Sequence, residues 1–507
     1  MSLAVLKSRA LAGMQAPQVN VEVHLANGLP TFTIVGLADT EVREARERVR
    51  AALQNSGFDM PARRITVNLA PADLPKESGR FDLAIALGIL AASGQIRAAP
   101  LDQFEYAGEL SLSGQLRPIR GALAMTFAMQ REIAAGAAPR GFILPTANAD
   151  EAALVTTARI YPAASLLQVC GHFADGEPAA RLQLHRSTLV TAPVAYPDFA
   201  EVKGQQQVKR ALEVAAAGSH SVLLIGPPGA GKSMLASRFV GILPPMTDDE
   251  ALEAATVQSL RDSLDTAQWK RRPFRAPHHT TSGVALVGGG SVPRPGEISL
   301  AHNGVLFLDE LPEFDRHVLE VLRQPLESGT ITISRAARQA EFPARFQLIA
   351  AMNPCPCGFQ GHPSRRCRCT AEAVLRYQSR ISGPLLDRID MQLEVAAMAP
   401  ADLMAAPDGA SSATIAARVA LASLRQLERQ GKNNQQLTPL EIDQHCRLNR
   451  SGETLLRNAM LRLHWSARAY YRVLRLARTI ADLSGDVAIQ PGHVAEAIQY
   501  RRALHEQ

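Results

Sequence analysis

The stretch Ser221 to Leu235 constrains this chain more than any other, because its residue types and their spacing together dictate one chemistry. It reads S-V-L-L-I-G-P-P-G-A-G-K-S-M-L. An apolar run typical of a buried strand precedes G-x-x-x-x-G-K-S, and helix-favouring residues follow. Glycines let backbone N–H groups turn inward around a polyphosphate, and the N-terminus of the next helix favours the anion. The pattern predicts a phosphate-binding loop made of Gly226, Pro227, Pro228, Gly229, Ala230, Gly231, Lys232, Ser233 and Met234.

Charged and metal-binding side chains complete this chemistry. Lys232 is expected to reach the outer phosphates, and Ser233 to ligate Mg²⁺. Downstream, the run N-G-V-L-F-L-D-E ends a second predicted strand with Asp309 and Glu310. Asp309 can hold Mg²⁺ through water, and Glu310 can orient the water that attacks the terminal phosphate. These residues predict ATP hydrolysis with Mg²⁺ as the cofactor.

Length and composition bound the rest. A chain of 507 residues exceeds one hydrophobic core, so several domains are expected. Lys7 and Arg9 interrupt the apolar start, and no apolar run is long enough to span a bilayer, so we expect a cytoplasmic protein without membrane partners. The net charge of +6 is only a weak lean toward polyanions, and 5% aromatic residues argue against recognition mainly by base stacking.

Residues 1–185 are predicted to form an α+β domain, followed by a linker over 186–198. Alternation around Asn27-Gly28 predicts a β-hairpin, since that pair supplies the positive φ angles of a tight turn. Further signals indicate a strand at Arg64–Ala70 and a buried helix at Phe81–Gly94. A helix from Thr40 is predicted to bury Val42, Ala45, Val49, Ala52 and Leu53.

This first domain resembles the Lon-protease-like fold, also known from domain 2 of ribosomal protein S5. The likeness lies in P-K-E-S-G-R-F-D from Pro75 and in G-E-L-S-L-S-G-Q-L-R-P-I-R-G from Gly108. Arg80 and Leu123 occupy the positions where those proteases carry their catalytic serine and lysine. A nucleophile needs its activating base, so no catalytic dyad is expected. Lys76 and Arg80 are instead candidates for DNA or subunit contacts.

Residues 199–398 resemble the core of AAA+ ATPases. The run F-Q-L-I-A-A-M-N ends a third predicted strand with Asn353, whose amide matches the sensor-1 position that orients the attacking water. Arg388 resembles the arginine finger inserted into a neighbour's ATP site, with a surface ion pair or Arg380 as the alternatives. The predicted helix Glu201–His220 matches the one that flanks adenine. Candidate base contacts are Val202, Lys203 and Gly204, unless this is a plain packing helix.

Two segments resemble the helix-2 and pre-sensor-1 inserts of magnesium chelatase ATPases and minichromosome-maintenance helicases. Residues 275–300 suggest a hairpin that breaks into a helix, and residues 329–346 a second hairpin with Arg335 and Arg338 near its tip. In a ring, such hairpins point into the pore, where basic side chains can follow a phosphate backbone. The alternative is that both arginines merely solvate an exposed hairpin.

Four cysteines form two C-x-C pairs in N-P-C-P-C-G-F-Q-G-H-P-S-R-R-C-R-C-T. A tetrahedral thiolate site for structural Zn²⁺ is one interpretation, although C-x-C is tighter than the usual zinc spacing. Reduced free thiols are the other. The residues concerned are Cys355, Cys357, Cys367 and Cys369.

Residues 399–507 are predicted to form a helical lid domain. Thr438-Pro439 is typical of a helix start, and Ser466 is predicted to cap a helix that runs to Leu483. Arg468 lies in the first turn, where the AAA+ lid carries its sensor-2 arginine, acting in its own or the adjacent subunit. Three further arginines are expected to face solvent or an interface: Arg472, Arg475 and Arg478.

The order of these parts, together with A-P-H-H-T-T-S and N-P-C-P-C-G, resembles the ComM/YifB family of magnesium-chelatase-like bacterial proteins. The resemblance implies a multidomain α/β protein that assembles as a hexameric ring. It further implies an ATP-dependent DNA helicase that promotes branch migration during recombination in natural transformation, with single-stranded or branched DNA and recombination proteins as partners. A chelatase-like ATPase that remodels proteins through a partner is the alternative, and ATP-dependent proteolysis is disfavoured by Arg80 and Leu123.

Overall fold

The computed structural model describes most of the chain in two compact units. The described residues are 3–36, 39–174, 181–187, 196–261, 265, 268–290, 293–335, 338–362, 365–398, 404 and 409–501, without the side chains of residues 40, 41, 335, 338 and 339. One unit comprises Met1–Ala192 with Ala255–Trp269, and the other Pro193–Ala254 with Lys270–Gln507. The linker predicted at 186–198 lies mostly outside the described residues.

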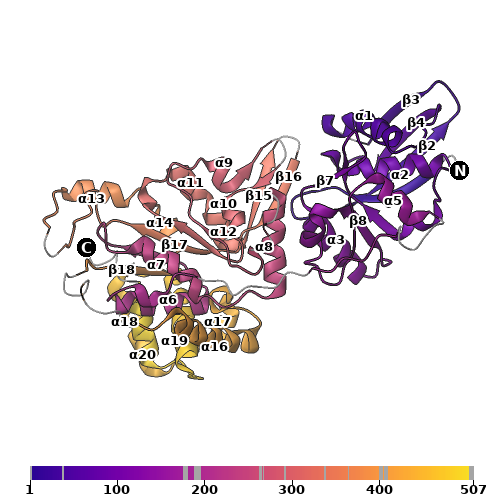
Figure 1. The fold of residues 1–507 in the computed structure, drawn as a ribbon. Coiled ribbons are helices and arrows are strands. Elements are labelled where there is room, and N and C mark those ends of the chain that lie inside the picture. The colour runs from indigo at the N-terminus through magenta and orange to yellow at the C-terminus, as the bar shows by residue number, and fades with distance from the viewer. Residues whose placement is uncertain are drawn as a thin grey trace. The chain divides into compact units, whose positions relative to one another are not determined.

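The first unit contains a seven-stranded mixed sheet in the order β3-β4-β2-β1-β5-β8-β9 (Figure 1). Its strands are β1 (Leu3–Arg9), β2 (Gln18–Ala26), β3 (Thr31–Val35), β4 (Arg64–Ala70), β5 (Phe104–Tyr106), β8 (Gly141–Pro145) and β9 (Arg159–Ala163). A small hairpin joins β6 (Glu109–Leu110) to β7 (Leu116–Arg117). The helices are α1 (Thr40–Asn55), α2 (Asp82–Ala92), α3 (Ala122–Ala134), α4 (Ala149–Ala152) and α5 (Leu166–Phe173).

Three local predictions for this unit are confirmed. Strand β4 has the predicted bounds, and α2 is buried along its whole length. In α1 the predicted apolar stripe is at most 1% exposed, and Asp39 caps the helix by accepting from the N–H of Val42. The spacing of apolar residues was sufficient here because each helix buries a continuous face in one hydrophobic cluster.

The prediction of a β-hairpin around Asn27-Gly28 is wrong. Strands β2 and β3 do not pair with each other, because β4 lies between them. It pairs antiparallel with β2 and parallel with β3. Parallel neighbours need a crossover connection, and α1 supplies it between β3 and β4. The burial of α1 against the sheet thus overrides a local turn signal.

The surface role suggested for Lys76 and Arg80 is also wrong. Lys76 is fully buried, and its ammonium donates to the carbonyl of Pro71. Arg80 is 6% exposed and donates to the Ser78 hydroxyl and the Glu77 carbonyl. Both cations therefore brace the loop that leads into α2.

The second unit is built on a five-stranded, all-parallel sheet in the order β11-β14-β17-β10-β18. The strands are β11 (Phe274–Arg275), β14 (Val305–Leu308), β17 (Gln347–Met352), β10 (Val222–Ile225) and β18 (Met391–Glu394). Helices α6 (Gln206–Gly218) and α7 (Lys232–Phe239) precede and follow β10. Helix α8 (Asp248–Arg261) comes next, and only its part up to Ala254 belongs to this unit. Since all strands run the same way, their carboxyl ends lie at one edge, where ligands bind in such sheets.

The helix predicted from Glu201 begins only at Gln206. Gly204 and Gln205 have φ angles of 58° and 55°, which end any helix before them. Val202 is buried in the hydrophobic core of this unit. Val202, Lys203 and Gly204 thus lie in a loop that leads into α6, and their contact with adenine stays a prediction.

Both predicted inserts are present. The first contains α9 (Gly283–Val287), the short strands β12 (Gly288–Gly289) and β13 (Arg294–Pro295), and α10 (Glu297–Leu300). After β14 come α11 (Arg316–Val321) and α12 (Arg323–Ser328). They lead to an antiparallel hairpin of β15 (Thr330–Arg335) and β16 (Arg338–Pro343), which returns the chain to β17. Helices α13 (Ala371–Gln378) and α14 (Gly383–Leu386) then precede β18.

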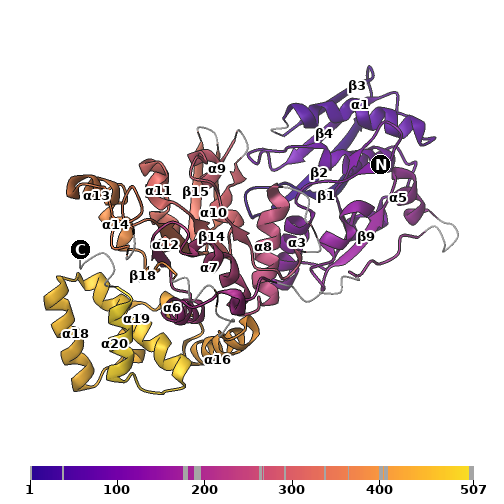
Figure 2. The same cartoon turned by 60° about the vertical axis from the view of Figure 1, so that its left-hand side comes forward.

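The C-terminal part is helical, as predicted. It comprises α16 (Ser412–Gln430), α17 (Pro439–His445), α18 (Arg450–Leu463), α19 (Ala467–Ser484) and α20 (Pro491–Gln499). Figure 2 shows α18, α19 and α20 side by side at one end of this unit. Thr438 and Ser466 cap α17 and α19 as expected, and Thr438 forms a full capping box with Glu441. None of the described helices has the length and apolarity needed to cross a bilayer.

The prediction that three arginines of α19 face solvent or an interface is wrong. Arg472 pairs with the buried carboxylate of Asp390, just before β18. Arg475 donates to the carbonyl of Leu437, and Arg478, 3% exposed, binds Asp482 at 3.0 Å. Asp390 and Leu437 lie outside the helix, so its pattern did not reveal them, whereas Asp482 stands four residues after Arg478 in the helix itself.

One ion pair of the first unit yields a test of its stability. Asp82 is fully buried and accepts from Arg48 at 2.7 Å and from the N–H of Leu110 at 3.2 Å. Burial raises the pKa of Asp82 from 3.8 to about 6, while Arg48 opposes the rise. The folded state therefore holds this proton more tightly than the unfolded state, so ionisation of Asp82 lowers the free energy of unfolding as the pH rises through that interval.

We expect Arg48→Met to lower the local stability of this unit by about 3 kcal/mol at pH 8, because Asp82 loses its partner. The loss should shrink as the pH falls from 8 toward about 6, because the unpaired Asp82 of the variant takes up its proton at a higher pH than the paired Asp82 does. Hydrogen–deuterium exchange of peptides from α1 and α2 in the full chain measures it. An equal effect of Arg48→Met in an Asp82→Asn background would contradict the assignment to this pair.

Candidate active site

The loop between β10 and α7 has the geometry of a phosphate-binding loop. Gly229 and Gly231 have φ angles of 78° and 90°, which glycine adopts without strain. Gly226 allows a close approach of a different kind, since a Cβ there would lie 2.3 Å from the carbonyl oxygen of Val395. These glycines shape the turn, and α7 begins at Lys232, directly after it.

This loop lines a cavity of about 310 Å³. Asp309 and Glu310 follow β14, and Asn353 follows β17, so the ends of neighbouring parallel strands bring them to the loop. The structure thus gathers the predicted core of the site in one place. The lining residues are Pro228, Gly229, Ala230, Gly231, Lys232, Ser233, Met234, Asp309, Glu310, Met352 and Asn353.

Lys232 links the loop to the strand end that carries Asn353. Its Nζ donates to the carbonyl oxygens of Gly226 at 2.7 Å and Pro227 at 3.0 Å, and to Asn353 Oδ1 at 3.1 Å. Burial lowers the pKa of Lys232, while the carboxylates of Asp309 and Glu310 act in the opposite direction. The ammonium therefore lies between the carboxylates of Asp309 and Glu310 and the backbone of the phosphate-binding loop. A phosphate oxygen could take the place of one of the carbonyl oxygens that now accept its hydrogen bonds.

Ser233 and Asp309 form the pair that fits Mg²⁺. The Ser233 hydroxyl donates to Asp309 Oδ2 at 2.6 Å, and Asp309 Oδ1 accepts from the N–H of Glu310 at 2.9 Å. Mg²⁺ prefers hard oxygen ligands and retains several waters. A hydroxyl and a carboxylate in contact at the mouth of an open cavity match that preference, so the residues present fit the ion.

Glu310 has a neighbour that the sequence reasoning did not identify. Its φ of 52° is unusual for a residue with a side chain, and its Oε2 lies 3.1 Å from His279 Nδ1. The ring of His279 lies beside that of His278, with centroids 4.1 Å apart and the ring planes tilted by 35°. The motif A-P-H-H-T-T-S contains both histidines but served only to indicate the family. Polar residues just beyond a strand adjacent to β14, here β11, were the available signal.

The predicted arginines are not gathered in this cavity. Arg388 is 9% exposed and pairs with Glu327 at 2.5 Å, whereas Arg380 is 54% exposed and pairs with Glu313 at 2.8 Å. Arg468 is exposed in the first turn of α19 and does not line the cavity. The roles of these arginines at a neighbouring subunit's site stay predictions.

At the tip of the β15–β16 hairpin, the backbones of Arg335 and Arg338 are paired in register. Their side chains lie outside the described part of the structure. The hairpin itself is confirmed, and contact of these arginines with DNA stays a prediction.

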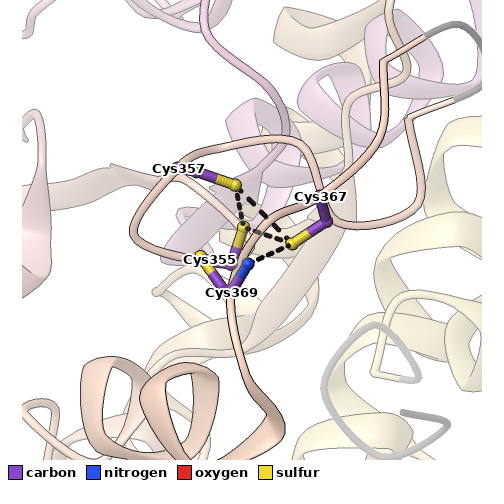
Figure 3. A group of neighbouring side chains, drawn as sticks. All are labelled: Cys355, Cys357, Cys367 and Cys369. Atoms are coloured by element: carbon purple, nitrogen blue, oxygen red, sulfur yellow. Dashed lines mark hydrogen bonds between the residues drawn. The ribbon is translucent and has the colours of Figure 1, made fainter.

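The four predicted cysteines do come together (Figure 3). Their sulfur atoms all lie within 4.8 Å of one another, in the loop between β17 and α13. Such a group could hold a metal ion. The residues are Cys355, Cys357, Cys367 and Cys369.

Comparison with protein-family models agrees with this architecture. The model described as magnesium chelatase, subunit ChlI, matches residues 198–403, which contain the parallel sheet and the cavity. A model described as subunit ChlI of Mg-chelatase matches residues 21–148, and one described as the ChlI C-terminal part matches residues 409–501.

Similar proteins cover the full chain. Competence protein ComM of Haemophilus influenzae is 51% identical over 99% of this chain and 98% of its own length. The Escherichia coli protein YifB is 48% identical over 99% and 97%. The chloroplastic magnesium-chelatase subunit ChlI of Nicotiana tabacum is 28% identical over 41% of this chain and 49% of its own length. The first two matches each cover 99% of this chain. The chain therefore belongs to the ComM/YifB family, which contains magnesium-chelatase-type domains.

Proposed function

We propose that this protein is an ATP-driven DNA translocase that works as a hexameric ring and promotes branch migration during recombination. The observation that carries the proposal is the single cavity in which Lys232, Ser233, Asp309, Glu310 and Asn353 meet. The Haemophilus influenzae relative is named a competence protein, and on that basis we propose a role in natural transformation for this chain.

The chain's own residues divide the work of ATP hydrolysis among them. Lys232 and the loop N–H groups bind and orient the phosphates. Bound Mg²⁺, held by Ser233 and Asp309, would neutralise phosphate charge. Glu310 orients the attacking water and accepts its proton, and Asn353 fixes that water from the neighbouring strand end.

ATP hydrolysis at this site would need a further cation to stabilise the charge that develops on the phosphate. Among the described residues that line the cavity, none is an arginine. Phosphoryl transfer develops charge that an arginine from a neighbouring subunit commonly stabilises. Head-to-tail contacts that supply such a residue close into rings, which supports the proposed hexamer with Arg388 or Arg380 acting in trans. To act in trans, Arg388 would have to leave Glu327 and Arg380 would have to leave Glu313, and Arg380 is the more exposed of the two.

The hairpin inserted between β14 and β17 supports DNA as the substrate. It places two arginines opposite each other at its tip, on the chain path between Glu310 and Asn353. Arginines at such tips can follow a phosphate backbone without reading sequence. A ring with these tips in its pore would couple nucleotide turnover to movement along DNA.

A second candidate function is a protein-remodelling ATPase that acts through a partner. It is favoured by the family models, which are described as magnesium-chelatase subunits. Stimulation of ATP hydrolysis by DNA supports the translocase, and stimulation by a protein partner alone supports the remodeller.

The decisive experiment compares three-way DNA junctions with linear duplexes. We expect ATP-dependent unwinding of the junction, together with DNA-stimulated ATP hydrolysis. Glu310→Gln should still bind ATP and DNA but lose roughly a hundredfold or more in kcat, because it removes the base. The matched control is Glu372→Gln in α13, whose exposed partner is Arg376. Full unwinding activity in Glu310→Gln would refute the assignment of this residue.

His279 is expected to position Glu310. His279→Ala should lower kcat roughly tenfold and leave KM for ATP within about twofold, because the base is still present but less well oriented. His279→Asn should recover part of the rate by restoring a hydrogen-bond donor. His278→Ala, which removes the neighbouring ring, is the control. Steady-state ATPase kinetics measure the difference, and a change confined to KM would argue for a binding role instead.

The hairpin arginines are expected to contact phosphates. Replacing Arg335 and Arg338 by alanine should weaken DNA binding uniformly across sequences and reduce the salt dependence by about one unit of slope for each arginine. Fluorescence anisotropy at several salt concentrations measures both quantities. A variant with Arg376→Ala and Arg418→Ala removes the same charge from exposed helices elsewhere. Equal slopes in the two variants would reject the hairpin as the DNA contact.

A further inference from the structure

The cysteine loop has the geometry of thiolates around one ion (Figure 3). The sulfur of Cys355 lies 3.4 Å from that of Cys357 and 3.7 Å from that of Cys367, and the last two are 3.6 Å apart. A disulfide would need about 2.05 Å. Two sulfurs on one tetrahedral Zn²⁺ lie about 3.8 Å apart, given bonds of about 2.3 Å. The observed distances match the second case.

Backbone N–H groups point at these sulfurs. The N–H of Cys369 donates to Cys367 Sγ at 3.4 Å. Such donors stabilise thiolates and orient them around a metal, as the outer partners of metal ligands do. The other donors are Gln360 for Cys355, and Phe359 and Arg368 for Cys357.

The loop that carries these cysteines is not stabilised by regular secondary structure. Between Met352 at the end of β17 and Ala371 at the start of α13, the described residues form no helix or strand. A connection of this length without regular structure is uncommon in a compact domain and usually has a function of its own. Three exposed arginines in the loop would offset the charge of about −2 on a tetrathiolate zinc centre. They are Arg365, Arg366 and Arg368.

The cysteine loop also contacts residues that line the proposed ATP site. Asn353, which binds Lys232 at 3.1 Å, stands two residues before Cys355. Gly358, with a φ of 81°, packs so closely that a Cβ there would lie 2.6 Å from Pro228 Cδ. On its other side, the carbonyl of Pro354 accepts from Gln378 of α13 at 3.1 Å. A cross-link within the loop would therefore fix both Asn353 and the phosphate-binding loop.

We propose that Cys355, Cys357, Cys367 and Cys369 bind one structural Zn²⁺ as a tetrathiolate, and that this ion holds Asn353 and Pro228 in place for nucleotide binding. Each thiol gives up its proton to the solvent as it binds the ion, and no redox change occurs. The zinc site stands independently, whereas its link to nucleotide binding rests on the proposed ATPase function. Iron–sulfur clusters hold their thiolates on separate irons, so the 4.8 Å spread fits a single ion.

Elemental analysis of the full chain, purified under reducing conditions, tests the zinc site. We expect one zinc per chain, released by a mercurial reagent and detected with a chromogenic chelator. Cys357→Ser and Cys367→Ser should lose the metal, and Cys446→Ser, a buried cysteine outside the loop, should retain it. Freely titrating thiols without metal, disulfides, or iron with sulfide would each overturn the proposal.

A pair of glycine variants tests the link to nucleotide binding while the cysteines stay intact. Gly358→Ala should retain zinc but bind a fluorescent ATP analogue on the order of tenfold more weakly, because its Cβ displaces Pro228. Gly361→Ala is the matched control, since Gly361 has a similar φ of 73° and no neighbour within 4 Å of a Cβ. Equal affinities in the two variants would reject the link.

Removal and return of the metal complete the test in the unmodified chain. Chelation should speed hydrogen–deuterium exchange in peptides covering 353–378 and the phosphate-binding loop, and added Zn²⁺ should restore the slow rates. Unchanged exchange in both peptides would overturn the structural role of the ion. If the zinc-loaded chain binds no nucleotide at all, the ATPase proposal fails while the zinc site stands.

Discussion

The parallel register of β10 between β17 and β18 is the constraint on which the rest of this structure depends. Ile225 is paired with Met352 on one side and with Glu394 on the other, so the chain leaves all three strands at one level. The N–H of Gly226 continues the ladder to the carbonyl of Met352 at 3.2 Å. A slip by one residue would turn every buried side chain of β10 to the other face and separate the loop from Asn353.

Buried polar contacts attach the C-terminal helices to this sheet. Asp390 accepts from the N–H of Ser221 at 3.1 Å, directly before β10, and pairs with Arg472 of α19. Burial opposes its ionisation, yet Arg472 and His220 hold the pKa of Asp390 well below its usual range. Gln347 of β17 binds the carbonyls of Ala215 and His220, each at 2.8 Å. Helix α19 is thus bound to the edge of the sheet where β10 and β18 begin, opposite to the edge that carries the cavity.

The sequence alone predicted features that depend on neighbouring residues, and it missed features that depend on partners far away in the chain. The loop at Gly226–Ser233, Asp309 and Asn353 were predictable because each follows directly on an apolar strand. The order of β3 and β4 was not, since a turn signal at Asn27-Gly28 says nothing about a strand that inserts later. Arg472 and Arg388 were misjudged or left open because Asp390 and Glu327 lie elsewhere in the chain. His279 was overlooked because its contact with Glu310 crosses an insert.

The placement of the β15–β16 hairpin has a mechanical consequence. The chain leaves the cavity at Glu310, runs through α11, α12 and the hairpin, and re-enters the cavity at Asn353. The N–H of Ala344 donates to the carbonyl of Gly329 at 2.8 Å and closes the base of the hairpin, so its two arms move together. The chain segment that carries the hairpin therefore begins and ends at residues that line the cavity. A displacement of the hairpin would thus be passed along the chain toward both Glu310 and Asn353.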